Sequence, residues 1–131
     1  MTEDPVALGR AWLEAVNRDD YDALVAASTE DVVVVPRLAA VDGNAFQGHD
    51  GLRDWLDMRS DAWPEMEGDV MELRPVGDGV IGGGVLRGVS PTGMTFEERI
   101  AGVLRFRDGK AYWVGFFRTE AEALEAAGLG A

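Results

Sequence analysis

The chain has 131 residues, of which 47% are hydrophobic, and it contains no cysteine. This length predicts one domain, residues 1–131, whose core needs neither disulfides nor a structural metal. The formal net charge of −12 makes the surface repel phosphate backbones and anionic headgroups, so we expect neither nucleic-acid nor membrane partners. Because the chain lacks cysteine and does not open on a basic segment, we expect a cytoplasmic protein without a signal peptide.

The first residues show the periodicity of a helix. Pro5 suits a first helical turn, and the apolar residues that follow it recur at helical spacing as far as Asn17. Asp19 or Asp20 provides a cap for a second, shorter helix. The sequence therefore predicts two consecutive helices at this end of the chain.

A strand and a third helix follow. Residues 32–35 are an unbroken run of valines, which is typical of a strand covered on both faces, and Pro36 ends its regular ladder. Residues 37–48 lack periodicity and predict a loop. A third helix is expected from about residues 48–50 up to Pro64.

The second half of the chain is predicted to be a meander of four strands and a final helix. Gly-containing turns separate the apolar and β-branched runs. Thr119 and Glu122 have the spacing of a capping box and predict a short C-terminal helix. Helices segregated from an antiparallel sheet give an α+β class. The four predicted strands are residues 70–76, 80–89, 95–107 and 111–117.

Five short stretches, in the same order along the chain, carry a family resemblance. They are residues 17–24, 30–32, 46–52, 106–110 and 122–129. Through them the chain resembles the NTF2-like superfamily, in particular its SnoaL-like and ketosteroid-isomerase-like members. The resemblance implies a cone in which a curved antiparallel sheet wraps around helices and encloses a pocket for a small apolar molecule. It also implies a homodimer.

The resemblance further implies where acids and donors of the known reactions would lie, and the chain departs at each position. Trp12 stands where ketosteroid-isomerase-like enzymes have an oxyanion-donating tyrosine. Pro36 replaces their aspartate base, and Gly102 replaces a third acid that SnoaL-type cyclases also use. The Asp, Arg, Asp set of limonene-epoxide hydrolases is absent, since Ala101 follows Arg99 where an acid is required.

One carboxylate remains as a candidate for catalysis. In the strand 95–107, alternation places the even-numbered residues on the apolar face, and Glu98 is the one charged residue among them. A carboxylate in apolar surroundings suits a general acid or base near neutral pH. The alternative is that Glu98 lies at the wet, open end of the strand, or that a bulge turns it outward.

The neighbouring strand and helix offer further candidates. If the even-numbered residues of strand 111–117 share the pocket with Glu98, Tyr112 would donate a hydrogen bond and Arg118 would hold an anionic group. Packing and rim positions are the alternatives for these two. Arg59, one helical turn after Trp55, also reaches towards this cavity unless it forms a surface salt bridge.

An apolar wall completes the predicted site. Two tryptophans of the predicted helices are its aromatic candidates, and three apolar residues on the pocket-facing side of the predicted strands are the others. Core packing is the alternative role for all of them. The five residues are Trp12, Trp55, Leu104, Val114 and Phe116. The run Gly82-Gly83-Gly84 either bends the sheet or leaves room for a ligand. His49 is the one histidine, so no His-based metal cluster is expected.

Two functional hypotheses follow from these residues. The first is an enzyme without a cofactor, an isomerase, cyclase or lyase, that acts on a small apolar substrate by proton transfer, with Glu98 and Tyr112 as its catalytic residues. The second is a dimeric protein that binds such a molecule, or serves an accessory role, without catalysis. Glu98 favours the first hypothesis, and the missing acids favour the second.

Overall fold

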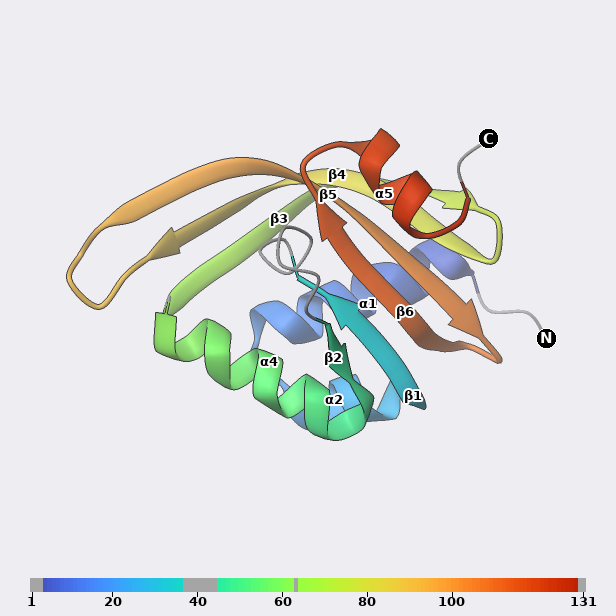
Figure 1. The fold of residues 1–131 in the computed structure, drawn as a ribbon, viewed down its shortest axis with the longest axis horizontal. Coiled ribbons are helices and arrows are strands. Elements are labelled where there is room, and N and C mark those ends of the chain that lie inside the picture. The colour runs from blue at the N-terminus through green and yellow to red at the C-terminus, as the bar shows by residue number, and fades with distance from the viewer. Residues whose placement is uncertain (1–3, 37–44, 63, 130–131) are drawn as a thin grey trace.

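The computed structural model describes residues 4–36, 45–62 and 64–129, and Figure 1 shows their arrangement. Helix α1 (Pro5–Asn17) and helix α2 (Tyr21–Ala26) confirm the two predicted N-terminal helices. The Asp4 side chain accepts a hydrogen bond from the backbone of Val6, which caps α1. Of the two candidate caps for α2, Asp20 is the one used, because its Oδ1 accepts the Ala23 N–H at 3.1 Å.

Six strands form one curled, mixed sheet in the order β2-β1-β6-β5-β4-β3. The strands are β1 (Ser28–Val35), β2 (Phe46–Gln47), β3 (Glu65–Val76), β4 (Gly79–Val89), β5 (Thr95–Arg107) and β6 (Lys110–Phe117). The last four form the predicted antiparallel meander. Between β2 and β3 runs helix α4 (Gly48–Ala62), and helix α5 (Glu120–Ala126) ends the fold.

The structure departs from the sequence-based expectations at four places. β1 begins at Ser28 and not at residue 32. β1 pairs with β6 in parallel, so the sheet is not wholly antiparallel. Two residues of the predicted loop form β2, which pairs with the C-terminal part of β1, while residues 37–44 lie outside the described part of the chain. β3 starts at Glu65 and not at residue 70, because its polar and charged first half lacks the apolar run used to predict it.

The two faces of the sheet pack against different helices (Figure 1). One cluster of buried residues joins α1, α2 and α4 to the concave face, with Trp12, Leu52 and Leu104 among its members. A smaller cluster joins α5 to the convex face through Val103 and Ala123. None of the described helices has the length and apolar character needed to cross a membrane.

The glycine run of β4 lies where the sheet bends. A Cβ atom on Gly82 would come within 1.9 Å of the Glu72 carbonyl oxygen on β3, so a side chain there is excluded. The β3–β4 register shifts between Val70 and Glu72, opposite Gly84 and Gly83. The bend interpretation of this run is therefore supported by a close backbone approach at a β-bulge. The alternative, room for a ligand, is supported as well, because all three glycines line the pocket described below.

Candidate functional site

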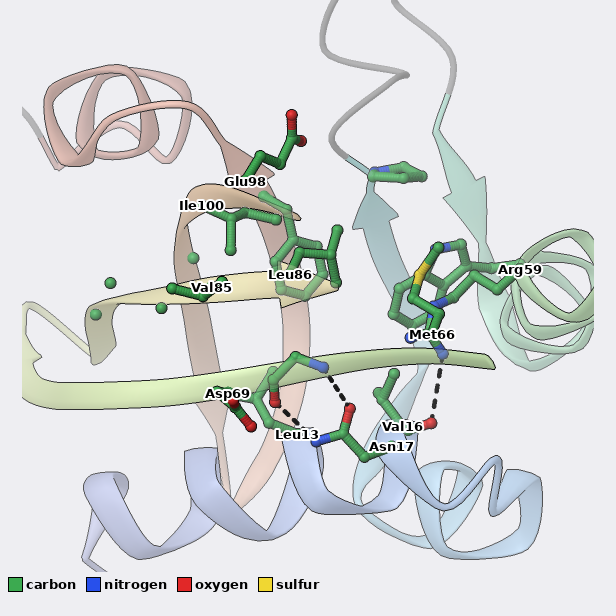
Figure 2. A pocket seen from close by; sticks show the side chains of 18 of the residues that line it. Leu13, Val16, Asn17, Arg59, Met66, Asp69, Val85, Leu86, Glu98 and Ile100 are labelled. Carbon is green, nitrogen blue, oxygen red and sulfur yellow. Dashed lines mark hydrogen bonds between the residues drawn. The ribbon is translucent and has the colours of Figure 1, made fainter. Parts of the chain in front are cut away.

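A pocket of about 420 Å³ lies between α1, α4 and the concave face of the sheet (Figure 2). This volume falls in the range of small-molecule sites in proteins. Its wall is mainly apolar, and it includes Leu13, Val16, Pro36, Trp55, Met66, Leu73, Val85, Leu86, Phe96, Ile100, Leu104 and Phe116. The wall residues that were not predicted include Leu13, Val16, Met66, Leu73, Val85 and Leu86; Leu13 and Val16 belong to the apolar residues at helical spacing in α1.

Strand β5 forms one side of the pocket through its even-numbered residues. Phe96, Glu98, Ile100, Gly102 and Leu104 all line it, which is the alternation expected from the sequence. Glu98, however, is exposed to solvent. Figure 2 shows its carboxylate pointing away from Leu13 and Asn17 on the opposite wall. The structure thus places Glu98 at the wet edge of the pocket, and the desolvated setting considered for it is not present.

Three aromatic rings stack in a row beside the pocket. The ring centroids of Trp12 and Trp55, and those of Trp55 and Phe116, are each 5.9 Å apart. Trp55 and Phe116 line the cavity, whereas Trp12 is fully buried behind Trp55. The indole N–H of Trp12 donates to the Ser28 hydroxyl at 3.0 Å. Trp12 therefore supports the wall and does not form it.

Arg59 carries a positive charge into the apolar pocket. It lies on α4 one turn after Trp55, with its guanidinium carbon 5.4 Å from the centre of the Trp55 ring. Its Nη1 donates to the Val16 carbonyl oxygen at 3.3 Å (Figure 2). Burial lowers the pKa of the guanidinium, and the charge of Asp19 offsets part of this effect. The pocket placement predicted for Arg59 agrees with the structure.

Two further polar side chains line the pocket but are occupied. The Asn17 side chain forms a pair of hydrogen bonds, both 2.9 Å long, with the backbone N–H and C=O of Gly68. Asp69 forms an ion pair with Arg87 on β4. Neither residue was predicted from the sequence, because both depend on contacts between segments far apart in the chain. They fasten α1 and β4 to β3, which fixes one wall.

The structure does not bring Tyr112 to the pocket. The β5–β6 register shifts between Arg105, which pairs with Trp113, and Phe106, which pairs with Ala111, so Tyr112 is the extra residue of a bulge. The side-chain alternation of β6 changes there by one residue. The Tyr112 hydroxyl donates to the Asp78 carboxylate at 2.5 Å, and its ring lies between Arg105 and Arg107. Burial and Asp78 raise the pKa of Tyr112.

Two other predicted site residues also lie outside the set that lines the pocket. Val114 is fully buried in the core between the sheet and the helices. Arg118 follows the last residue of β6 and is exposed. Among the predicted site residues, the pocket brings together Glu98, Trp55, Arg59, Leu104 and Phe116.

The two positions at which the family resemblance implies acids lie in the wall of the pocket. Pro36, at the end of β1, and Gly102, on β5, both line it. Neither side chain handles a proton, so the carboxylates of the pocket are Asp69 and Glu98 within the residues described. Over the same ranges, no group of three or more His, Cys, Asp or Glu residues is placed to hold a metal ion.

Comparison with known proteins identifies the fold. Residues 9–114 match the SnoaL-like domain. An NTF2-like protein of unknown function from Burkholderia pseudomallei has a TM-score of 0.78 and 21% identity, with 95% of this chain and 97% of that chain covered. The resemblance and the fold class expected from the sequence are thereby confirmed. No curated protein matched the chain.

Two more solved structures share the fold. IdmH from Streptomyces antibioticus, a candidate polyketide cyclase, has a TM-score of 0.75 and 23% identity, with 96% of this chain and 99% of that chain covered. TerC, co-crystallised with polyporic acid, has a TM-score of 0.76 and 20% identity, with 95% of this chain and 96% of that chain covered. At these identities the likeness concerns the fold, since one fold hosts many functions.

Proposed function

This chain belongs to the SnoaL-like domain family, and we propose that it is an enzyme that acts by proton transfer on a small apolar molecule. The observation that carries the proposal is the apolar cavity of about 420 Å³ with the Glu98 carboxylate on its wall. The apolar wall selects the body of the substrate. Glu98 takes a proton from the bound molecule or gives one to it, as in an isomerase, a cyclase or a lyase.

Glu98 lacks the desolvated setting expected for it, so its role in this proposal rests on its place in the wall of the apolar pocket. Because the carboxylate is exposed, it exchanges protons with water between cycles, while its strand neighbours Phe96 and Ile100 form the apolar wall beside it. Asp69, the other carboxylate of the wall among the described residues, is held in an ion pair with Arg87. A positioned carboxylate contributes about 10²–10⁴-fold to the rate of a proton transfer.

Structural relatives support this class of reaction. IdmH is a candidate polyketide cyclase, and so is a protein from Xanthomonas campestris with 23% identity and a TM-score of 0.70 that covers 90% of this chain. Ring closure in such a cyclase requires a proton to leave a carbon atom. These relatives support the proposal through their shared fold alone. The role of Glu98 is inferred from the pocket of this chain.

A second function is favoured by a specific observation. Pro36 and Gly102 line the pocket at the two positions where the family resemblance implies acids. A pocket without these groups fits a protein that binds a small apolar molecule without converting it. The two functions agree on the ligand and differ on whether Glu98 moves a proton.

Exchange of carbon-bound hydrogen tests the proposal without knowledge of the natural substrate. The apolar ketone 2-tetralone is incubated with the protein in D₂O, and NMR follows the loss of hydrogen next to the carbonyl. We expect the wild type to accelerate exchange over buffer and Glu98→Gln to lose at least about 100-fold of that acceleration. Glu125→Gln is the control, because Glu125 is an exposed carboxylate on α5, which packs on the other face of the sheet.

Binding and exchange are measured separately so that the two functions can be told apart. Saturation-transfer NMR reports whether the ketone binds. Binding with no acceleration, or with equal acceleration by Glu98→Gln, would establish the binding function in place of the enzymatic one. Absence of binding by any apolar ketone of this size would contradict both.

A further inference from the structure

Arg59 has surroundings unlike those of the other described arginines. Arg18, Arg74, Arg87, Arg105 and Arg107 each form an ion pair with an aspartate or a glutamate. A second group, Arg10, Arg53, Arg99 and Arg118, is exposed, so that water solvates the charge. Arg59 is half-buried and lines the pocket. Among the described residues, no carboxylate forms an ion pair with it.

The groups around Arg59 solvate its charge only in part. The acceptor it has in the described structure is the Val16 carbonyl oxygen, at 3.3 Å from Nη1. The face of the Trp55 ring lies beneath the guanidinium, with 5.4 Å between the guanidinium carbon and the ring centre. A guanidinium carries five N–H donors in a planar fork. Donors therefore remain beyond this one contact, and Arg59 is among the residues that line the pocket.

Partial burial of the Arg59 guanidinium costs free energy, because its charge loses hydration. A negatively charged group on a ligand would offset this cost. Burial lowers the pKa of Arg59, which reflects the loss of solvation of its charged form. Asp19 acts on it electrostatically but does not form an ion pair with it. Asp69 does not fill this role either, because it is paired with Arg87, and no ion pair joins Glu98 to Arg59 within the described structure.

We propose that the Arg59 guanidinium binds an anionic oxygen of the ligand, so that the pocket selects apolar organic acids, such as carboxylates or enolates, over neutral molecules of the same shape. The inference rests on the proposed function, because it assumes that the pocket holds a small apolar molecule. It adds the chemical class of that molecule and the residue that recognises it. A planar oxygen pair on the ligand matches the fork of the guanidinium.

A pair of isosteric probes tests this selectivity. Naphthalene-2-carboxylate and naphthalene-2-carboxamide have nearly the same shape and differ in charge, and titration calorimetry at pH 7 gives the affinity of each. We expect the wild type to bind the carboxylate about tenfold or more tightly than the amide, since a hydrogen bond to a charged group is worth more than a neutral one. Arg59→Met should abolish this preference and leave amide binding within about threefold.

Two further variants separate recognition from folding. Arg53→Met makes the same change of charge on the same helix, at an exposed arginine stacked over Tyr21, and should keep the preference. Arg59→Lys keeps the charge and loses the fork, so its preference should lie between those of the wild type and Arg59→Met. Circular dichroism verifies that each variant is folded.

The outcomes distinguish this inference from the function on which it rests. Equal affinity of the wild type for both probes, or an unchanged preference in folded Arg59→Met, would overturn the role of Arg59 and leave the apolar pocket intact. If neither probe bound the wild type, the proposed function would fail and this inference with it.

Discussion

Trp12 donates a hydrogen bond from its indole Nε1 to the Ser28 hydroxyl at 3.0 Å, and both residues are buried. The bond joins α1 to the first residue of β1. It also occupies the donor at the position where the family resemblance implies an oxyanion-stabilising tyrosine. Trp12 consequently has a structural role, and the Trp55 ring separates it from the cavity.

Loss of the Ser28 hydroxyl should destabilise the protein. Ser28→Ala leaves the indole N–H of Trp12 buried without an acceptor, which costs about 1–3 kcal/mol of unfolding free energy. Urea denaturation measures this cost. The double variant with Trp12→Phe should be less destabilised than the sum of the two single changes, because the two residues interact directly. Strict additivity of the two changes would contradict the prediction.

Adjacent glycines of β4 should differ sharply in their tolerance of alanine. A Cβ atom on Gly82 would lie 1.9 Å from the Glu72 carbonyl oxygen, whereas one on Gly83 would meet nothing nearer than the Ile100 carbonyl oxygen at 4.0 Å. We expect Gly82→Ala to cost about 3 kcal/mol or more and Gly83→Ala less than about 1 kcal/mol. Thermal and urea unfolding of the two variants provide the comparison, with Gly83→Ala as the control.

Similar stability of the two glycine variants would show that β3 moves away from Gly82 at little cost. In that case the bend would not depend on the close approach of the two strands. A selective loss of stability in Gly82→Ala would show that the close approach of β3 to β4 requires glycine at this position.

Local patterns predicted the β5 side of the site, because alternation along one strand determines which residues share a face. This is why Glu98, Gly102 and Leu104 were placed correctly on one wall. The same rule failed at Tyr112, where a bulge arises from the pairing of β5 with β6. The sequence of one strand does not reveal whether it pairs residue for residue with its neighbour or carries an extra residue in a bulge.

Contacts between distant segments account for most of what the sequence did not reveal. The Asn17 side chain bonds to Gly68 across 51 residues of sequence, and no periodicity connects these positions. Burial of Trp12 behind Trp55 depends on the packing of α1 against α4. Arg59 was predicted near the cavity because helical spacing from Trp55 is local. That none of the described carboxylates forms an ion pair with Arg59 became visible only in three dimensions.

The fall in the free energy of unfolding at acid pH should depend in part on Asp78. Burial tends to raise the pKa of the Asp78 carboxyl, but hydrogen bonds from Arg105 and Tyr112 and the charge of Arg105 hold the pKa below its ordinary value. A carboxyl with a lowered folded-state pKa stabilises the fold above its unfolded pKa of about 4 and loses this contribution as the pH falls through the folded value. Asp78→Asn should therefore reduce the loss of stability on going from pH 5 to pH 2.

Urea unfolding at several pH values in that window measures the effect. The control is Asp108→Asn, in the β5–β6 turn, where Asp108 has a φ of 54° that asparagine also adopts readily. Because the Asp78 side chain is 40% exposed, solvent screens its ion pair and the change should be modest. An unchanged pH dependence in Asp78→Asn would argue against any contribution from the Arg105 and Tyr112 contacts.

Filling the cavity from β5 should block binding with little effect on folding. Ile100 is half-buried and lines the pocket beside Glu98, so a tryptophan in its place would extend into empty space. We expect Ile100→Trp to weaken binding of both naphthalene probes at least about tenfold while the unfolding free energy changes by less than about 1.5 kcal/mol. Thr95→Trp places the same side chain at an exposed site on the opposite face of the strand and should bind both probes as the wild type does. Undiminished binding by a stable Ile100→Trp would place the ligand somewhere other than this cavity.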